Sequence, residues 1–63
     1  MSDSFNMSMR KFLKQVGVTS QQAIEEAMRG ANTSGKTYEV TAVVEIKEMS
    51  LNHVVTGRIT GKE

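Results

Sequence analysis

The spacing of apolar residues changes once along this chain, at the segment Gly30–Lys36, which is rich in glycine and small polar residues. Before this segment apolar residues recur every three or four positions, which is typical of amphipathic helices. After it they alternate with polar residues, which is typical of strands with one buried and one solvated face. The sequence therefore predicts a helical half followed by a sheet half, in a single α+β domain spanning residues 1–63.

The helical half is expected to contain two helices. The first runs from about Asp3 to Val16, and Gly17 supplies a left-handed stop. The second starts at Thr19, where Thr19 and Gln22 form a capping box, and ends near residue 31. The apolar face of the first helix consists of Phe5, Met9, Phe12, Leu13 and Val16, and that of the second of Ala23, Ile24, Ala27, Met28 and Ala31.

The sheet half is expected to form a two-stranded antiparallel hairpin. Alternation runs through residues 37–47 and again through residues 51–60, with Leu51, His53, Val55 and Ile59 on one side of the second strand. The link through Glu48, Met49 and Ser50 contains no Asn-Gly or Asp-Gly pair. A tight two-residue turn is therefore not predicted.

The size of the chain favours self-association. It has 63 residues, no cysteine and one histidine, so neither disulfides nor a His/Cys metal cage can stabilise a small core. A lone two-stranded ribbon is marginal in water. We expect a homodimer in which two hairpins form a four-stranded sheet, with exchange of an element between subunits giving an intertwined form.

The segment Gly30–Thr37 reads GANTSGKT and matches the phosphate-loop pattern G-x-x-x-x-G-K-[ST]. A working phosphate loop follows a buried strand and opens a helix, whose N-terminus adds partial positive charge to the backbone N–H cradle. Here the expected order is reversed, with a helix before the string and a strand after it. We interpret the match as a turn between the two halves and expect no nucleotide cofactor; a weak anion site on backbone N–H groups is the alternative.

Two surface features are candidates for contacts with other molecules. Arg10, Lys11 and Lys14 share the helix face opposite the apolar residues, where they would either be solvated or bind an anion such as nucleic acid. Nucleic acid is the less favoured partner, because few aromatic residues are available to stack on bases. Apolar residues that interrupt the polar side of the sheet and its link predict a protein-contact surface: Val43, Met49, Leu51 and Val54.

No catalytic, metal-binding or cofactor-binding residues are predicted. His53 is the only histidine, and no nucleophile and orienting group accompany it in the sequence. The formal net charge is +1, so no strong electrostatic field is expected. Met1–Met9 does not read as a signal peptide, and no stretch approaches the ~20 apolar residues of a membrane span. A cytoplasmic protein is expected.

Two segments of the chain resemble a known family. They are Phe5–Arg29, reading FNMSMRKFLKQVGVTSQQAIEEAMR, and Leu51–Ile59, reading LNHVVTGRI. Both are similar to a family of short bacterial proteins classed as a domain of unknown function, and the run RKFLKQVGVTSQ is the most specific part. The resemblance implies a stand-alone dimeric domain of two helices and two strands with no assigned activity. The phosphate-loop string lies outside the resembling segments.

These observations favour a non-catalytic homodimeric interaction module, with an unknown protein as a further partner. The alternative is a nucleic-acid or anion-binding accessory protein that uses the basic helix face. An NTP-binding enzyme is the third and least favoured class, because the surroundings that the motif requires are missing.

Overall fold

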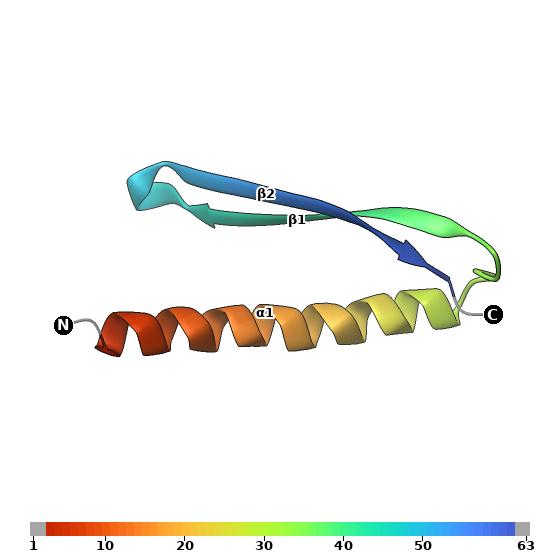
Figure 1. Ribbon diagram of the computed structural model, residues 1–63, viewed down its shortest axis with the longest axis horizontal. Coiled ribbons are helices and arrows are strands. Elements are labelled where there is room, and N and C mark those ends of the chain that lie inside the picture. Colours follow the sequence, from red (N-terminus) through yellow and green to blue (C-terminus); the bar gives the residue numbers. More distant parts are fainter. Residues whose placement is uncertain (1–2, 62–63) are drawn as a thin grey trace. The chain divides into compact units, whose positions relative to one another are not determined.

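A computed structural model describes residues 3–61 and contains one helix and one hairpin (Figure 1). The elements follow the order α1 (Asp3–Arg29), β1 (Thr37–Ile46), η1 (Lys47–Met49) and β2 (Leu51–Thr60). The chain divides between Asn32 and Thr33 into two compact units, a helical unit and a hairpin unit. The α+β class and the two strands are confirmed.

The prediction of two helices is wrong, because α1 continues without interruption from Asp3 to Arg29. A left-handed stop at Gly17 would require a positive φ, and among the described glycines only Gly35 has one. Thr19 does not cap a second helix. Its hydroxyl donates a hydrogen bond of 2.8 Å to the carbonyl of Gln15, one turn earlier, as threonine does inside a helix.

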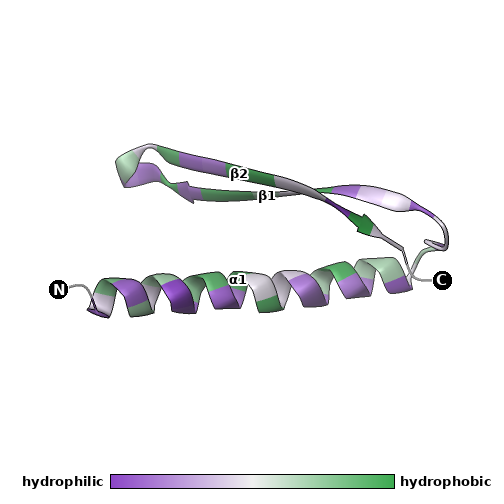
Figure 2. Cartoon of the chain, in the orientation of Figure 1, coloured by the Kyte–Doolittle hydropathy of each residue, from purple (hydrophilic) through white to green (hydrophobic). Residues whose placement is uncertain are grey.

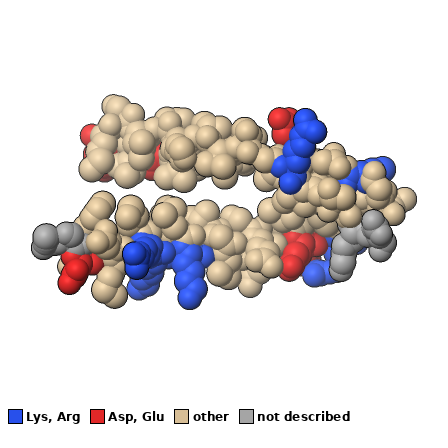
Figure 3. All heavy atoms as spheres, viewed as in Figure 1, with Lys and Arg blue, Asp and Glu red and all other residues tan. Residues whose placement is uncertain are grey.

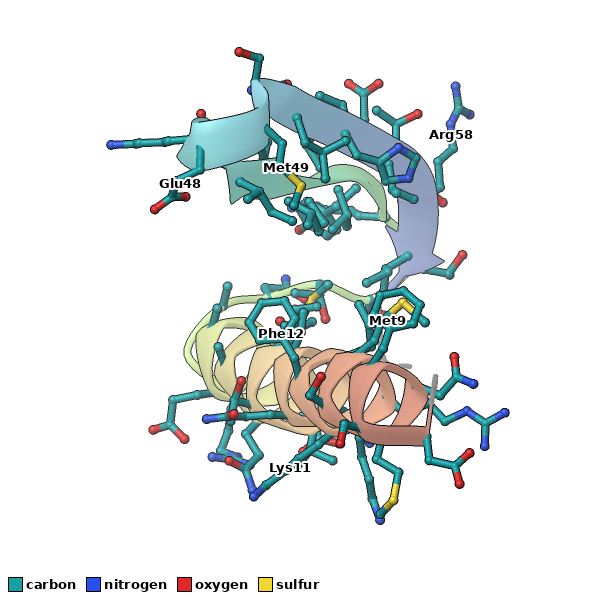
Figure 4. The ribbon with its side chains drawn as sticks, turned by 90° about the vertical axis from the view of Figure 1, so that its left-hand side faces the viewer. Met9, Lys11, Phe12, Glu48, Met49 and Arg58 are labelled. Carbon is teal, nitrogen blue, oxygen red and sulfur yellow. The ribbon has the colours of Figure 1, made fainter. Side chains whose placement is uncertain are left out.

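One continuous helix places the apolar residues of both predicted helices on one broad face, with Leu13, Ile24 and Met28 toward one edge of it. At 3.6 residues per turn, seven residues fall within an arc of about 80°. We call this set the α1 stripe: Phe5, Met9, Phe12, Val16, Ser20, Ala23 and Ala27. Figure 4 shows the side chains of Met9 and Phe12 leaving the same side of α1, and that of Lys11 leaving the opposite side.

The uninterrupted helix predicts the outcome of replacing Gly17. An alanine Cβ at this position would meet no atom within 4 Å, and alanine is favoured over glycine inside a helix by about 1 kcal/mol. Gly17→Ala should therefore raise the helix content and the free energy of unfolding by about 0.5–1 kcal/mol, measured by circular dichroism during urea unfolding. A loss of stability would mean that Gly17 ends a helix after all.

The hairpin pairs ten residues of each strand in antiparallel register, from Thr37 opposite Thr60 to Ile46 opposite Leu51. Directly opposed residues share a face of the ribbon. The apolar hairpin face consists of Tyr38, Val40, Ala42, Val44, Ile46, Leu51, His53, Val55, Gly57 and Ile59. The polar hairpin face consists of Thr37, Glu39, Thr41, Val43, Glu45, Asn52, Val54, Thr56, Arg58 and Thr60. In the hydropathy colouring of Figure 2 the alternation is interrupted, because Val43 and Val54 on the polar face are themselves hydrophobic.

The strands are joined by a four-residue link, so the expectation that no two-residue turn occurs is confirmed. Residues 47–49 form a single 3₁₀ turn, and Ser50 closes it with φ 54° and a 3.1 Å hydrogen bond from its N–H to the carbonyl of Lys47. A left-handed conformation is unfavourable for residues other than glycine, asparagine and aspartate. Ser50 adopts it because the chain has to reverse between two long strands.

A second turn, before β1, is attached to the end of β2. The N–H of Lys36 donates to the carbonyl of Thr33 at 3.1 Å, and Gly35 has φ 72°, which is a type II turn. The N–H of Gly61 donates to the carbonyl of Lys36 at 2.8 Å. Thr33 and Gly61 are the two buried residues of the described chain. The turn therefore belongs to the hairpin unit and closes its open end.

Apolar side chains are poorly covered in both units. Within residues 3–61, no hydrophobic residue is buried. On α1, Phe5 is 63% exposed and Phe12 52%, and on the hairpin Val55 is 51% exposed. Within residues 3–61 each unit, taken by itself, is thus amphipathic and has a largely exposed apolar face.

Candidate functional site

The phosphate-loop string lies between a helix and a strand, in the order opposite to that of a phosphate loop. α1 ends at Arg29, directly before Gly30, and β1 begins at Thr37, the last residue of the string. Directly after the string, residues 37–46 form strand β1 and not a helix whose N-terminus would face a bound phosphate. Thr37 instead lies opposite Thr60 on the polar hairpin face.

The type II turn explains the second half of the string without a ligand. Gly35 supplies the positive φ that such a turn requires at its third position. Thr33 packs against Gly61, and the carbonyl of Lys36 accepts a hydrogen bond from the Gly61 N–H. The turn residues are therefore used to join the two ends of the hairpin unit.

Replacing Lys36 tests whether the string binds nucleotides. Lys36→Ala keeps the backbone carbonyl and N–H that form the turn, so the free energy of unfolding should stay within about 0.5 kcal/mol of the original. Backbone amide shifts of both proteins should be unaffected by magnesium-ATP. Shifts confined to residues 30–37 that disappear in Lys36→Ala would establish a nucleotide site.

The four predicted protein-contact residues do not form one surface. Val43 and Val54 are cross-strand partners in the middle of the polar hairpin face, and they are 56% and 50% exposed. Leu51 lies on the opposite, apolar face, where it pairs with Ile46. Met49 belongs to the link and is 73% exposed. Val43 and Val54 thus form an apolar pair surrounded by threonine and charged residues.

The predicted basic residues do share one side of α1. Arg10, Lys11 and Lys14 lie on the helix face opposite the α1 stripe, and positive side chains gather on one side of the N-terminal half of the helix in Figure 3. Near the other end of α1, Arg29 forms an ion pair with Glu26 at 2.8 Å. The three cations are exposed.

Two further polar features of residues 3–61 lie on the hairpin, one on each face. His53 lies opposite Val44 on the apolar hairpin face. A shallow depression on the polar hairpin face is lined by Thr37, Glu39 and Arg58. Among the residues that the structure describes, no three His, Cys, Asp or Glu side chains are grouped so that they could hold a metal ion. No helix in the same range has the length and apolar character needed to span a membrane.

The α1 stripe, except Ser20, was predicted as parts of two apolar helix faces and not as a contact surface. In the structure its large members Phe5, Met9 and Phe12 are 63%, 42% and 52% exposed. The sequence did indicate an exposed apolar surface, because a chain of 63 residues without cysteine carries two apolar faces and has few means of covering both. The contact of Thr33 with Gly61 was also missed, because it joins residues distant in sequence.

The chain resembles a known protein family over nearly its whole length. Residues 1–62 match the family of unknown function DUF6494. The chain belongs to this family. The DUF6494 match confirms the resemblance seen in the sequence and extends it over Gly30–Thr37, which the resembling segments did not include. No curated protein and no solved structure matches the chain.

Proposed function

We propose that this DUF6494 protein is a non-catalytic interaction module that works as a homodimer. The observation that carries the proposal is the absence of any buried hydrophobic residue within residues 3–61. Burial of apolar surface is the main favourable contribution to folding. A chain whose apolar faces are half exposed needs a further surface to cover them.

The exposed area supports a partner of about the same size as the chain. The chain exposes 5740 Å². A compact monomer of 7.0 kDa exposes about 4,000 Å², so the excess is about 1,700 Å² per chain. Two copies that covered this excess would bury roughly 3,400 Å² together, within the range of about 2,000–5,000 Å² for obligate homodimers.

The hairpin offers a second copy a sheet edge to extend. Two hairpins paired edge to edge make a four-stranded antiparallel sheet, which is stable where a two-stranded ribbon is marginal. We propose β2 as the pairing strand. β1 carries Glu39 and Glu45 and no cation, so a β1–β1 contact would gather four carboxylates, whereas a β2–β2 contact gathers only two copies of Arg58. Charged residues on an outer strand also discourage further pairing.

A two-fold axis at Val55 gives the β2–β2 contact a favourable register. Leu51 then lies opposite the partner's Ile59, and His53 lies opposite the partner's Gly57, where space is available. On the other face Asn52 lies opposite the partner's Arg58. No like charges are therefore directly opposed, and directly opposed like charges would destabilise the sheet. In an intertwined form of the same dimer, the two copies exchange an element.

Light scattering tests the dimer directly. At micromolar concentration the mass should be about 14 kDa, twice the 7.0 kDa of one chain. Diluting the protein should reduce helix content together with mass, because folding and association are coupled in an obligate dimer. A folded species of 7 kDa at all concentrations would refute the proposal.

Amide hydrogen exchange tests which edge is used. If β2 pairs with β2, all amides in the middle of β2 are hydrogen-bonded and exchange slowly, whereas every second amide of β1 faces outward and exchanges quickly. Continuous protection of β1 with alternating protection of β2 would assign the pairing to β1. Alternation in both strands would exclude a four-stranded sheet.

An anion-binding accessory role is the second candidate, favoured by the exposed cations Arg10, Lys11 and Lys14 on one face of α1. Binding of short RNA or DNA through these three groups should weaken steeply as salt rises. Replacing all three with glutamine should abolish binding, while the control Lys36→Gln, on the hairpin unit, should not affect it. Absence of binding to RNA and DNA at low salt would remove this candidate.

A further inference from the structure

We infer that two copies of the chain pair their α1 helices antiparallel, with the two-fold axis at Val16. This inference rests on the homodimer proposed above and specifies the surface that covers the α1 stripe. It depends on α1 being a single helix, because only a continuous helix places residues 5–27 on one face.

The spacing of the α1 stripe reads the same in both directions from Val16. Successive members are separated by four, three and four residues from Phe5 to Val16, and again by four, three and four from Val16 to Ala27. Each half is an 11-residue repeat of about 3.67 residues per turn, which keeps the stripe nearly straight. An antiparallel copy turned about Val16 therefore brings every stripe residue opposite another stripe residue.

The side-chain sizes are complementary only in this arrangement. The members on the N-terminal side of Val16 are large, and those on the C-terminal side are small. In the antiparallel pair Phe5 faces the partner's Ala27, Met9 faces the partner's Ala23, and Phe12 faces the partner's Ser20. Each of these three contacts joins one large and one small side chain, and at the axis the medium-sized Val16 faces its own copy, so the helix axes stay at one distance along their whole length.

A parallel pair would not pack evenly. It would place Phe5, Met9 and Phe12 against their own copies at one end, and Ala23 and Ala27 against their own copies at the other. Large side chains separate helix axes and small ones let them approach, over a range of about 8–10 Å. The two ends would thus demand different separations, which leaves either a void or a clash.

The charged residues of α1 also favour the antiparallel pair. α1 carries Arg10, Lys11 and Lys14 in its first half, and Glu25 and Glu26 in its second half. About the axis at Val16 the basic residues lie level with Gln22, Gln21 and Val18 of the second copy, and the two glutamates lie level with its Met7 and Asn6. Asp3 lies level with the partner's Arg29. A parallel pair would align each charge with its own copy, which is unfavourable.

The helix pair and the β2–β2 sheet are both two-fold symmetric contacts between two copies of the chain. The helix contact and the strand contact are nevertheless separate surfaces, and each can be tested without the other.

Distances between spin labels test the geometry. The chain has no cysteine, so single labels can be attached through Ser4→Cys, Gln15→Cys and Gln22→Cys, all on the side of α1 away from the stripe. With a rise of 1.5 Å per residue, the separations along the helix axis should be about 36, 3 and 18 Å. The sideways separation is similar for all three. Gln15→Cys should therefore give the shortest label distance and Ser4→Cys the longest.

The label distances test the antiparallel helix pairing separately from the formation of a dimer. Equal distances at the three positions, or a minimum away from residue 15, would overturn the antiparallel pairing while light scattering still shows a dimer. A monomeric mass for the unlabelled protein would overturn both.

A size-swapped pair of substitutions gives an independent test. Ser20→Phe should weaken self-association at least about tenfold, because it opposes two phenylalanines. Adding Phe12→Ser restores one large and one small residue at each contact and should return the dissociation constant to within about threefold. Positions 12 and 20 are eight residues apart on one helix, so rescue has to act between copies. A double variant weaker than either single variant would contradict the inference.

Discussion

Val16→Lys is expected to abolish the dimer and, with it, most of the folded structure. The two-fold axis passes through Val16, so the substitution would place two ammonium groups against each other in an apolar contact. Burying an unpaired charge is strongly unfavourable, and like charges at short range add to the cost. We expect a loss of at least about 3 kcal/mol per dimer. Light scattering should give a mass near 7 kDa, and circular dichroism should show reduced helix content.

Gln15→Lys is the matched control for this substitution. It introduces the same side chain one position earlier on α1, about 100° around the helix and away from the stripe. It should leave mass and helix content unchanged. A dimeric Val16→Lys protein would show that Val16 is not at the interface, whereas failure of both variants would indicate that this part of α1 tolerates no further positive charge.

Gly61→Ala is expected to destabilise the hairpin unit. An alanine Cβ at this position would overlap the Thr33 carbonyl oxygen and lie 2.7 Å from its carbon. These are backbone atoms of a turn that is held by the Lys36-to-Thr33 hydrogen bond, so they cannot move aside without opening it. The cost should be about 1–3 kcal/mol, as for overpacking elsewhere. Urea unfolding measures this cost, and faster amide exchange at Lys36, the donor of that hydrogen bond, should locate the opening.

Gly57→Ala serves as the control for Gly61→Ala. It lies on β2, four residues before Gly61, where a Cβ would meet no atom within 4 Å. Because glycine weakens a strand interior, Gly57→Ala should be neutral or slightly stabilising. Equal destabilisation by both substitutions would show that the Thr33 contact has no special role.

The strands were predictable because alternation is a local property. β1 and β2 each carry an alternating pattern, interrupted at Val43 and Val54, and such a pattern fits an extended chain with one covered face. The absence of a turn-forming Asn-Gly pair correctly excluded a two-residue turn. Of the predicted contact surface, however, only Val43 and Val54 came together, because register decides which residues of two strands share a face.

The helix was misjudged at Gly17 because two local signals competed. Glycine followed by threonine resembles a stop and a new N-cap, and the cost of glycine inside a helix is only about 1 kcal/mol. That cost is offset by the hydrogen bonds of an unbroken helix. The spacing of four, three and four residues, which continues across Gly17 from Phe5 to Ala27, indicated one helix more reliably than the single glycine indicated two.

By itself, the sequence determined the division into a helical and a sheet half, the two strands, and the reading of Gly30–Thr37 as a turn after a helix. Each follows from interactions within a few residues. Only the tertiary structure decided the continuity of α1, the pairing of Val43 with Val54, and the contact between Thr33 and Gly61. These depend on how competing local preferences are balanced over long segments, and on which residues distant in the chain meet.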